Sequence, residues 1–187
     1  QRLSIRRGLQ KQVAPVEGVP IHAKTVLTHW LEGEFGYRSS TGMRDQVMMR
    51  VAMICELPFR RTYDPSETMM SILAPVARDD DVFLDVVDAT LQVREGAADA
   101  DTLRQMLAEA GSAWTVAKGN RALERAADAA TLASFNAATS PGDQASVELE
   151  EAWANAYGRS PNPSDAWDHA IKAVEDVLIP IVTPTNL

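Results

Sequence analysis

The side chains best suited to acid–base or metal chemistry are the three histidines. His22 and His29 are seven residues apart, which places them two turns apart on one side of a helix. No Cys, His or acidic pair at ligand spacing completes a zinc site with them. Asp165 precedes His169 by four residues, the spacing of an ordinary helix-surface pair. Acid–base catalysis would also need a partner and a pocket, and the sequence indicates neither, so we interpret His169 as a surface residue.

Two further features could carry chemistry, the single cysteine and a run of three aspartates. Cys55 lies in an apolar stretch without a basic neighbour, so we interpret it as an unreactive core residue. Asp79, Asp80 and Asp81 could contribute to a cation site, but consecutive carboxylates do not converge on one ion, and no spaced calcium loop follows them. They suit the positive end of a helix dipole better. Phosphate-loop, dinucleotide-glycine, nucleophile-elbow and HExxH motifs are absent, so we predict no cofactor and no metal.

Charge is spread unevenly along the chain. Residues 1–78 carry 11 Lys and Arg against 7 Asp and Glu, whereas residues 79–187 carry 7 against 19. The first part therefore tolerates an anionic partner better than the second, although surface composition also drifts without a functional cause. Loop arginines make bidentate contacts with carboxylate or phosphate, and the alternative is a solvated basic loop. The predicted partner-binding residues are Arg6, Arg7, Arg60 and Arg61.

The elements that position these side chains are predicted to be helices. Apolar periodicity bounded by Gly, Pro and capping residues predicts helices over residues 21–35, 43–57, 79–94, 101–110, 126–138, 147–157 and 163–178, with a further one from residue 66 that Pro75 breaks or kinks. The stretch SAWTVAKGNRALERA instead has the alternation and turn residues of a β-hairpin. The predicted fold is mostly α, a helical bundle in two parts with one short β-hairpin near residues 113–125. The predicted domains are 1–98, an N-terminal helical domain, and 113–187.

Two helices carry expectations about burial. Residues 47–55 are apolar nearly all round, apart from Arg50, and such a helix is usually buried. In the last helix, His169 lies about 200° around the axis from Trp167, so we expect it to face outward. The side chains predicted to form the buried face of that helix are Trp167, Ala170, Ile171, Val174, Val177 and Leu178.

The totals limit the class of protein. The chain has 187 residues, of which 45% are hydrophobic and 24% charged, as in ordinary globular proteins. No apolar run approaches the roughly 20 residues that span a bilayer, so no membrane partner is expected. A single cysteine excludes an internal disulfide and fits a cytoplasmic protein. The apolar ending LIPIVTPTNL leads us to expect that the second domain continues beyond Leu187.

A family resemblance adds to these inferences. The order AW-x-x-A-YGR-x-P-x-P-x-x-A-x-x-x-AIKAVE, filled by residues 152–175, resembles the C-terminal module of AbiJ-like abortive-infection proteins of the HEPN superfamily, found in actinobacteria and their phages. RRGL, EGVP and LTHWL are similar to the short N-terminal domain that precedes such modules. The stretch from SAWTV to LERA is similar to the middle part of the family's sequences. The resemblance implies a mostly helical, two-part protein of phage defence, often a metal-independent ribonuclease with a closely spaced Arg–His pair.

That catalytic pair cannot be carried over to this chain. The nearest Arg before His169 is Arg159, ten residues away. The first hypothesis is therefore a non-catalytic, defence-associated module that binds a host or viral protein, with RNA and a second copy of the chain as further candidate partners. The second is a HEPN-type ribonuclease toxin whose Arg–His segment lies beyond Leu187. A structural phage protein is the third.

Overall fold

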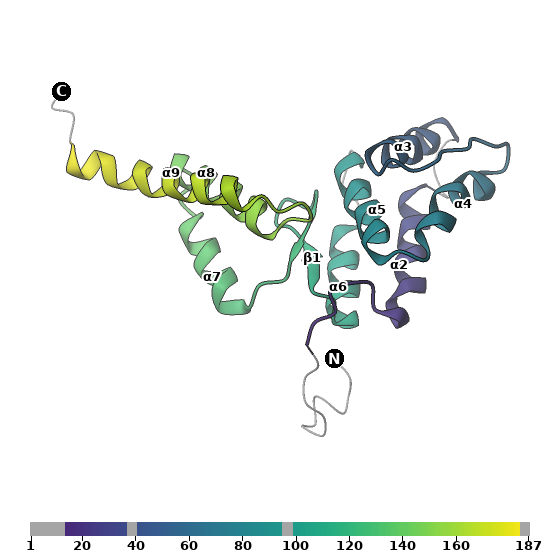
Figure 1. Cartoon of the computed structure of the whole chain (residues 1–187), viewed down its shortest axis with the longest axis horizontal. Helices are drawn as coiled ribbons and strands as arrows, with labels where there is room; N and C mark the ends of the chain where they lie inside the picture. Colours follow the sequence, from purple (N-terminus) through teal and green to yellow (C-terminus); the bar gives the residue numbers. More distant parts are fainter. Residues whose placement is uncertain (1–13, 37–40, 95–98, 184–187) are drawn as a thin grey trace, which may run out of the picture. The chain divides into compact units, whose positions relative to one another are not determined.

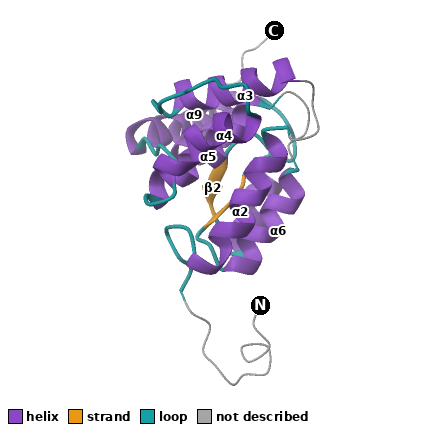
Figure 2. Ribbon diagram, turned by 90° about the vertical axis from the view of Figure 1, so that its right-hand side faces the viewer, coloured by secondary structure: helices purple, strands orange, loops and turns teal. Residues whose placement is uncertain are grey.

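The computed structural model describes residues 14–36, 41–94 and 99–183, which are mostly helical (Figure 1). Figure 2 shows the same helices in purple and a two-stranded sheet in orange. The helices are α2 (Ile21–Glu34), α3 (Thr41–Ile54), α4 (Pro65–Val76), α5 (Asp80–Val93), α6 (Ala100–Ala110), α7 (Ala129–Ala138), α8 (Gln144–Tyr157) and α9 (Pro163–Val182). The strands are β1 (Trp114–Val116) and β2 (Leu123–Arg125). The predicted fold class, mostly α with a short hairpin, is confirmed.

Short polar side chains determine where most of these helices begin. Each accepts a hydrogen bond from a backbone N–H of the first turn, which would otherwise have no partner. Asp79, for example, accepts from the N–H of Asp81 at 3.0 Å and of Val82 at 3.2 Å, so the aspartate run acts as a helix start. At the other end of α6, Gly111 adopts a left-handed conformation with φ of 72°, which ends the helix. The capping residues are Asp64, Asp79, Asp99, Asp128, Asp143 and Asn162.

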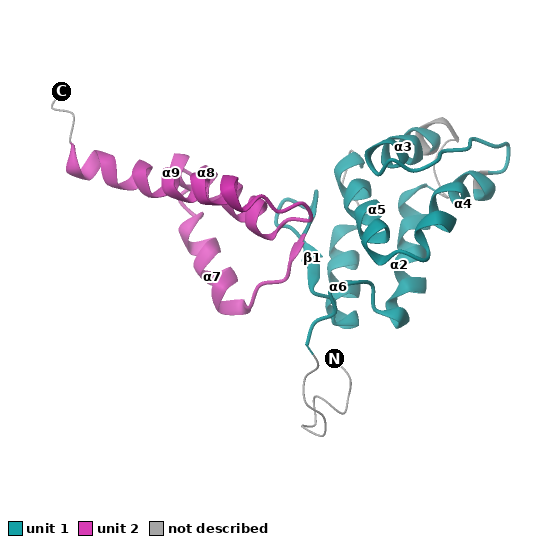
Figure 3. Cartoon of the chain, viewed as in Figure 1, with its two compact units in different colours: residues 1–123 teal, residues 124–187 magenta. Residues whose placement is uncertain are grey.

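The chain forms two compact units, residues 1–123 and 124–187 (Figure 3). The first unit extends past the predicted domain limit at residue 98 and includes α6, β1 and Leu123. The reason is burial, because Trp114, Val116 and Leu123 of the hairpin are all 5% exposed or less and pack in the core of the first unit. The division therefore falls inside the hairpin, and the second unit begins eleven residues after residue 113, the predicted start of the second domain.

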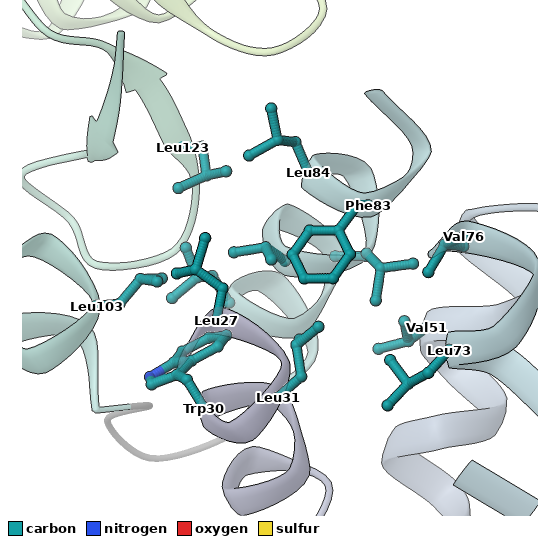
Figure 4. Packing of buried hydrophobic residues seen from close by; sticks show 14 of the residues in the cluster. Leu27, Trp30, Leu31, Val51, Leu73, Val76, Phe83, Leu84, Leu103 and Leu123 are labelled. Carbon is teal, nitrogen blue, oxygen red and sulfur yellow. The ribbon is translucent and has the colours of Figure 1, made fainter. Parts of the chain in front are cut away.

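The core of the first unit is formed by helices α2 to α6 and the hairpin. Figure 4 shows the ring of Phe83, from α5, among aliphatic side chains that α2, α3 and α4 contribute. Truncating a fully buried Leu in such a core typically costs about 2 to 5 kcal/mol. The labelled members of this cluster are Leu27, Trp30, Leu31, Val51, Leu73, Val76, Phe83, Leu84, Leu103 and Leu123.

A short extended segment before α2 is tied to both the hairpin and α5. The backbone of Val16 pairs with the chain around Ser112, and the Trp114 Nε1–H donates to the carbonyl of Glu17 at 2.6 Å. The N–H of Val19 donates to Asp80 Oδ2 at 3.2 Å. These bonds fix the position of the extended segment against the first unit.

The C-terminal end of α2 is held by a buried carboxylate. Glu34 is 6% exposed, and its Oε1 accepts from the N–H of Asp99 at 2.9 Å. Its Oε2 lies 3.0 Å from Arg94 Nε, but the geometry does not suit a hydrogen bond, so we describe this contact as an ion pair. The Nε1–H of Trp30, one turn earlier, donates to the carbonyl of Asp99 at 3.1 Å. The end of α2 is therefore joined to the start of α6 by polar bonds at the edge of an apolar core.

Helix α3 corrects the expectation that residues 47–55 are buried all round. Met48, Val51 and Ala52 are 1% exposed or less, but Met53 is 73% exposed. The physical reason is that α3 packs on α4 and α5 from one side only, so its apolar composition exceeds what the core can cover.

The second unit is a set of three helices in which α8 and α9 form an antiparallel pair (Figure 3). Helix α7 is held to α8 by aromatic stacking, because the rings of Phe135 and Trp153 lie 4.2 Å apart between centroids. The rings of Trp153 and Tyr157 are also stacked, with their centroids 4.2 Å apart. The Nε1–H of Trp153 donates to Glu124 Oε2 at 3.0 Å. Trp153 is thus the central aromatic residue of this unit.

Candidate interaction surface on α9

Helix α9 packs on α8 through its small side chains. Ala166 and Ala170 are partly buried and Ala173 is 8% exposed, and their spacing of four and three residues places them on one side of the helix. His169 lies on this side too, and its Nδ1 is 2.7 Å from Glu148 Oε2 of α8. Alanines allow two helix backbones to approach closely, so the face with the smallest side chains became the packed face.

This arrangement overturns the predicted orientation of α9. Trp167, predicted to be buried, is 69% exposed, whereas His169, predicted to face outward, is among the packed residues. Of the six side chains assigned to the buried face, only Ala170 is partly buried. The assignment followed the largest apolar side chains, although the helix has two candidate faces and α8 covers the one with small residues.

The result is an exposed apolar stripe along α9. Its members follow a spacing of four, three, four and three residues, so they lie within about 80° of the helix circumference and span about 21 Å of its length. We call these residues the α9 stripe: Trp167 (69% exposed), Ile171 (42%), Val174 (56%), Leu178 (49%) and Ile181 (69%).

The two edges of the α9 stripe differ in charge. On one side lie Ala166 and Ala170, which face α8. On the other side Asp168 and Glu175 lie about 80° to 100° from Trp167, seven residues apart and both exposed. The open edge of the stripe therefore carries two carboxylates, with Lys172 about 40° further round the helix from Asp168, whereas α8 covers the other edge from Ala166 to Ala173 and leaves Val177 beyond it 52% exposed.

Glu148 on α8 and His169 on α9 are two acid–base side chains that the fold of the second unit brings together, and the sequence interpretation missed this partner of His169. The hydrogen bond with the His169 ring holds the pKa of Glu148 below its usual value, against partial burial, which acts in the opposite direction. The pair fastens α9 to α8 beside Ala173. The signal that could have found it was the short GRSPNP connection, which predicts an antiparallel neighbour for α9.

The predicted partner-binding arginines are only partly described. Arg6 and Arg7 lie outside the described residues. Arg60 and Arg61 lie in the connection between α3 and α4, as predicted, and both are exposed. Arg61 Nε is 2.8 Å from Asp45 Oδ2, and the N–H of Arg60 donates to Ser71 Oγ at 3.2 Å. The cation of Arg61 is thus engaged within its own unit, while binding by these arginines stays a prediction.

The remaining candidates for chemistry are the thiol of Cys55 and groups of side chains that could bind a metal ion. Burial, with the negative charges of Asp85 and Asp88, raises the pKa of the Cys55 thiol to about 11, in agreement with an unreactive core cysteine. Within residues 14–36, 41–94 and 99–183, no three His, Cys, Asp or Glu side chains gather where they could hold a metal ion. In the same ranges no helix has the length and apolarity needed to cross a membrane.

Comparisons with family models, with curated proteins and with solved structures found no match to this chain.

Proposed function

We propose that this protein is a helical binding module that engages another protein through the α9 stripe and performs no catalysis itself. The observation that carries the proposal is the exposure of five large apolar side chains in one continuous row, from Trp167 to Ile181. Scattered apolar residues are normal on a protein surface, but a contiguous row on one helix is typical of an interaction site. The hydrophobic effect favours covering it.

The setting we propose is phage defence, with a host or viral protein as the partner and the cytoplasm as the compartment. Its support is the AbiJ-like pattern of residues 152–175. Several of the alanines and Trp153 of that pattern take part in packing the second unit, which suits a motif for helix packing. The ribonuclease alternative has less support, because the ring of His169 bonds to Glu148 of α8 and the nearest preceding arginine is Arg159.

Site-specific photo-cross-linking tests the binding proposal. A photoreactive phenylalanine analogue replaces Val174 in the stripe or, as a matched control, Val147 on α8, which is 48% exposed and also apolar. In cells of the source organism, we expect a discrete cross-linked product from position 174 that position 147 does not give. Adding Leu178→Ser should abolish that product while the melting temperature is retained. Identical patterns from the two positions would contradict the proposal.

A further inference from the structure

We infer that the partner element is a single amphipathic helix with Lys or Arg along one edge, laid against the α9 stripe so that its basic edge faces Asp168 and Glu175. This inference rests on the proposed binding function and adds the chemistry of the partner. It follows from three properties of the described residues: the period of the stripe, the one open edge, and the charge of the second unit.

The period of the α9 stripe fits a helical partner. The alternation of four and three residues from Trp167 to Ile181 averages 3.5 residues, the repeat by which two helices keep one contact line. A strand or an irregular loop would not match a row that follows a helix axis, whereas an amphipathic helix buries apolar residues at the same spacing. The length of about 21 Å corresponds to about four helical turns of the partner.

The second unit provides the charge that selects this helix. Residues 124–187 contain 10 Asp and Glu against 3 Lys and Arg, a balance of −7. The acidic edge with Asp168 and Glu175 is the edge that α8 leaves open. Opposite charges beside an apolar contact line determine which helices pair. A partner with cations seven residues apart would place one near each carboxylate.

The same charges disfavour a second copy of this chain. Two copies would bring together units that each carry −7. In a twofold dimer with antiparallel α9 helices, Asp168 and Glu175 would face the same carboxylates of the other copy. An acidic unit is also a poor surface for RNA, whose backbone carries one negative charge per nucleotide.

Two synthetic peptides of 21 residues test the inference with the full chain. Both peptides carry leucine at the apolar positions of a seven-residue repeat. The positions that flank the leucines are lysine in one peptide and glutamate in the other, and all remaining positions are alanine. Binding of the labelled peptides is followed by fluorescence anisotropy at low and high salt. We expect the lysine peptide to bind about tenfold more tightly than the glutamate peptide, with the difference shrinking at high salt, since surface charges are screened.

A charge exchange provides the decisive variant. Asp168→Lys with Glu175→Lys should reverse the preference, so that the glutamate peptide binds more tightly. The control is Asp176→Lys with Glu151→Lys, which changes the net charge equally at exposed positions away from the stripe. The control should retain the preference for the lysine peptide.

The other outcomes separate the inference from the function beneath it. Equal binding of both peptides, lost in Leu178→Ser, would overturn the basic partner and leave the binding function standing. A lack of binding by either peptide, together with identical cross-linking from positions 174 and 147, would overturn both. A dimer in light scattering that Val174→Asp dissociates would identify a second copy as the occupant. A single-stranded RNA oligonucleotide that displaces the lysine peptide would identify a nucleic-acid ligand, and each of these two results would overturn the inference.

Discussion

Replacing Trp167 by Ala should cost little stability, although tryptophan truncations are usually severe. The side chain is 69% exposed, so about a third of it is removed from solvent in the folded protein. A fully enclosed tryptophan buries about 150 to 250 Å², so the buried third corresponds to about 50 to 80 Å². At about 25 cal/mol per Å², Trp167→Ala should therefore lower the free energy of unfolding by about 1 to 2 kcal/mol.

Trp153 offers a matched comparison in the same unit. It stacks on Phe135 and Tyr157 at 4.2 Å, and its indole N–H bonds to Glu124. Trp153→Ala removes these contacts and leaves a cavity, which should cost about 3 to 5 kcal/mol. The difference between the two variants thus depends on which tryptophan faces solvent, and both changes remove the same atoms.

Urea unfolding of the full chain, followed by far-ultraviolet circular dichroism, measures both values. The transition of the second unit should shift strongly in Trp153→Ala and slightly in Trp167→Ala. Acrylamide quenching adds an independent check, because Trp167→Ala should remove the most accessible part of the tryptophan emission. A Trp167→Ala variant as unstable as Trp153→Ala would refute the orientation of α9 and, with it, the α9 stripe.

Three further predictions follow from the polar groups. The pKa of Glu148 is lowered in the folded state, so its contribution to stability is complete above its usual pKa of 4.5 and is lost as the pH falls through the lower folded value. Thermal melts from pH 6 to 3 should therefore show a larger loss of stability on acidification in the wild type than in Glu148→Gln. The same melts on His169→Ala should show a similar loss of acid dependence. Cys55, with its pKa raised to about 11, should react with iodoacetamide at pH 8 far more slowly than in urea, as mass spectrometry can show. Glu34→Ala should cost about 3 kcal/mol in urea unfolding because it leaves the Arg94 cation without its buried partner, and a cost below about 1 kcal/mol would contradict that account.

Local signals explain why the elements could be predicted. A capping aspartate such as Asp79 and a left-handed glycine such as Gly111 act on their own backbone neighbours, so their effect is visible in a few consecutive residues. The hairpin was predicted for the same reason. The limit between the two units depends instead on where Trp114 and Leu123 find apolar partners distant in the sequence.

The face of α9 could not be predicted from the residues of α9. Periodicity shows that apolar residues share a side, but the packed side depends on the partner helix. Here α8 receives alanines and His169, and the larger side chains from Trp167 onward remain outside. On α9 the larger apolar side chains therefore lie on the exposed face, and the smaller ones lie on the packed face. The Glu148–His169 bond was missed for the same reason, since it joins two helices.

The bond from Trp114 to Glu17 has a consequence for the order of events during synthesis. It joins residues 97 positions apart, so this bond cannot form until Trp114 has been made, although Val19 of the same segment can bond to Asp80 earlier. At about 5 to 20 residues per second, that interval is about 5 to 20 s. Helices α2 to α5 can contact one another earlier, but the contacts between the hairpin and the extended segment before α2 form last. Nascent chains that end before residue 114 would then lack the bond from Trp114 to Glu17, which would make this segment more accessible to proteases and chaperones.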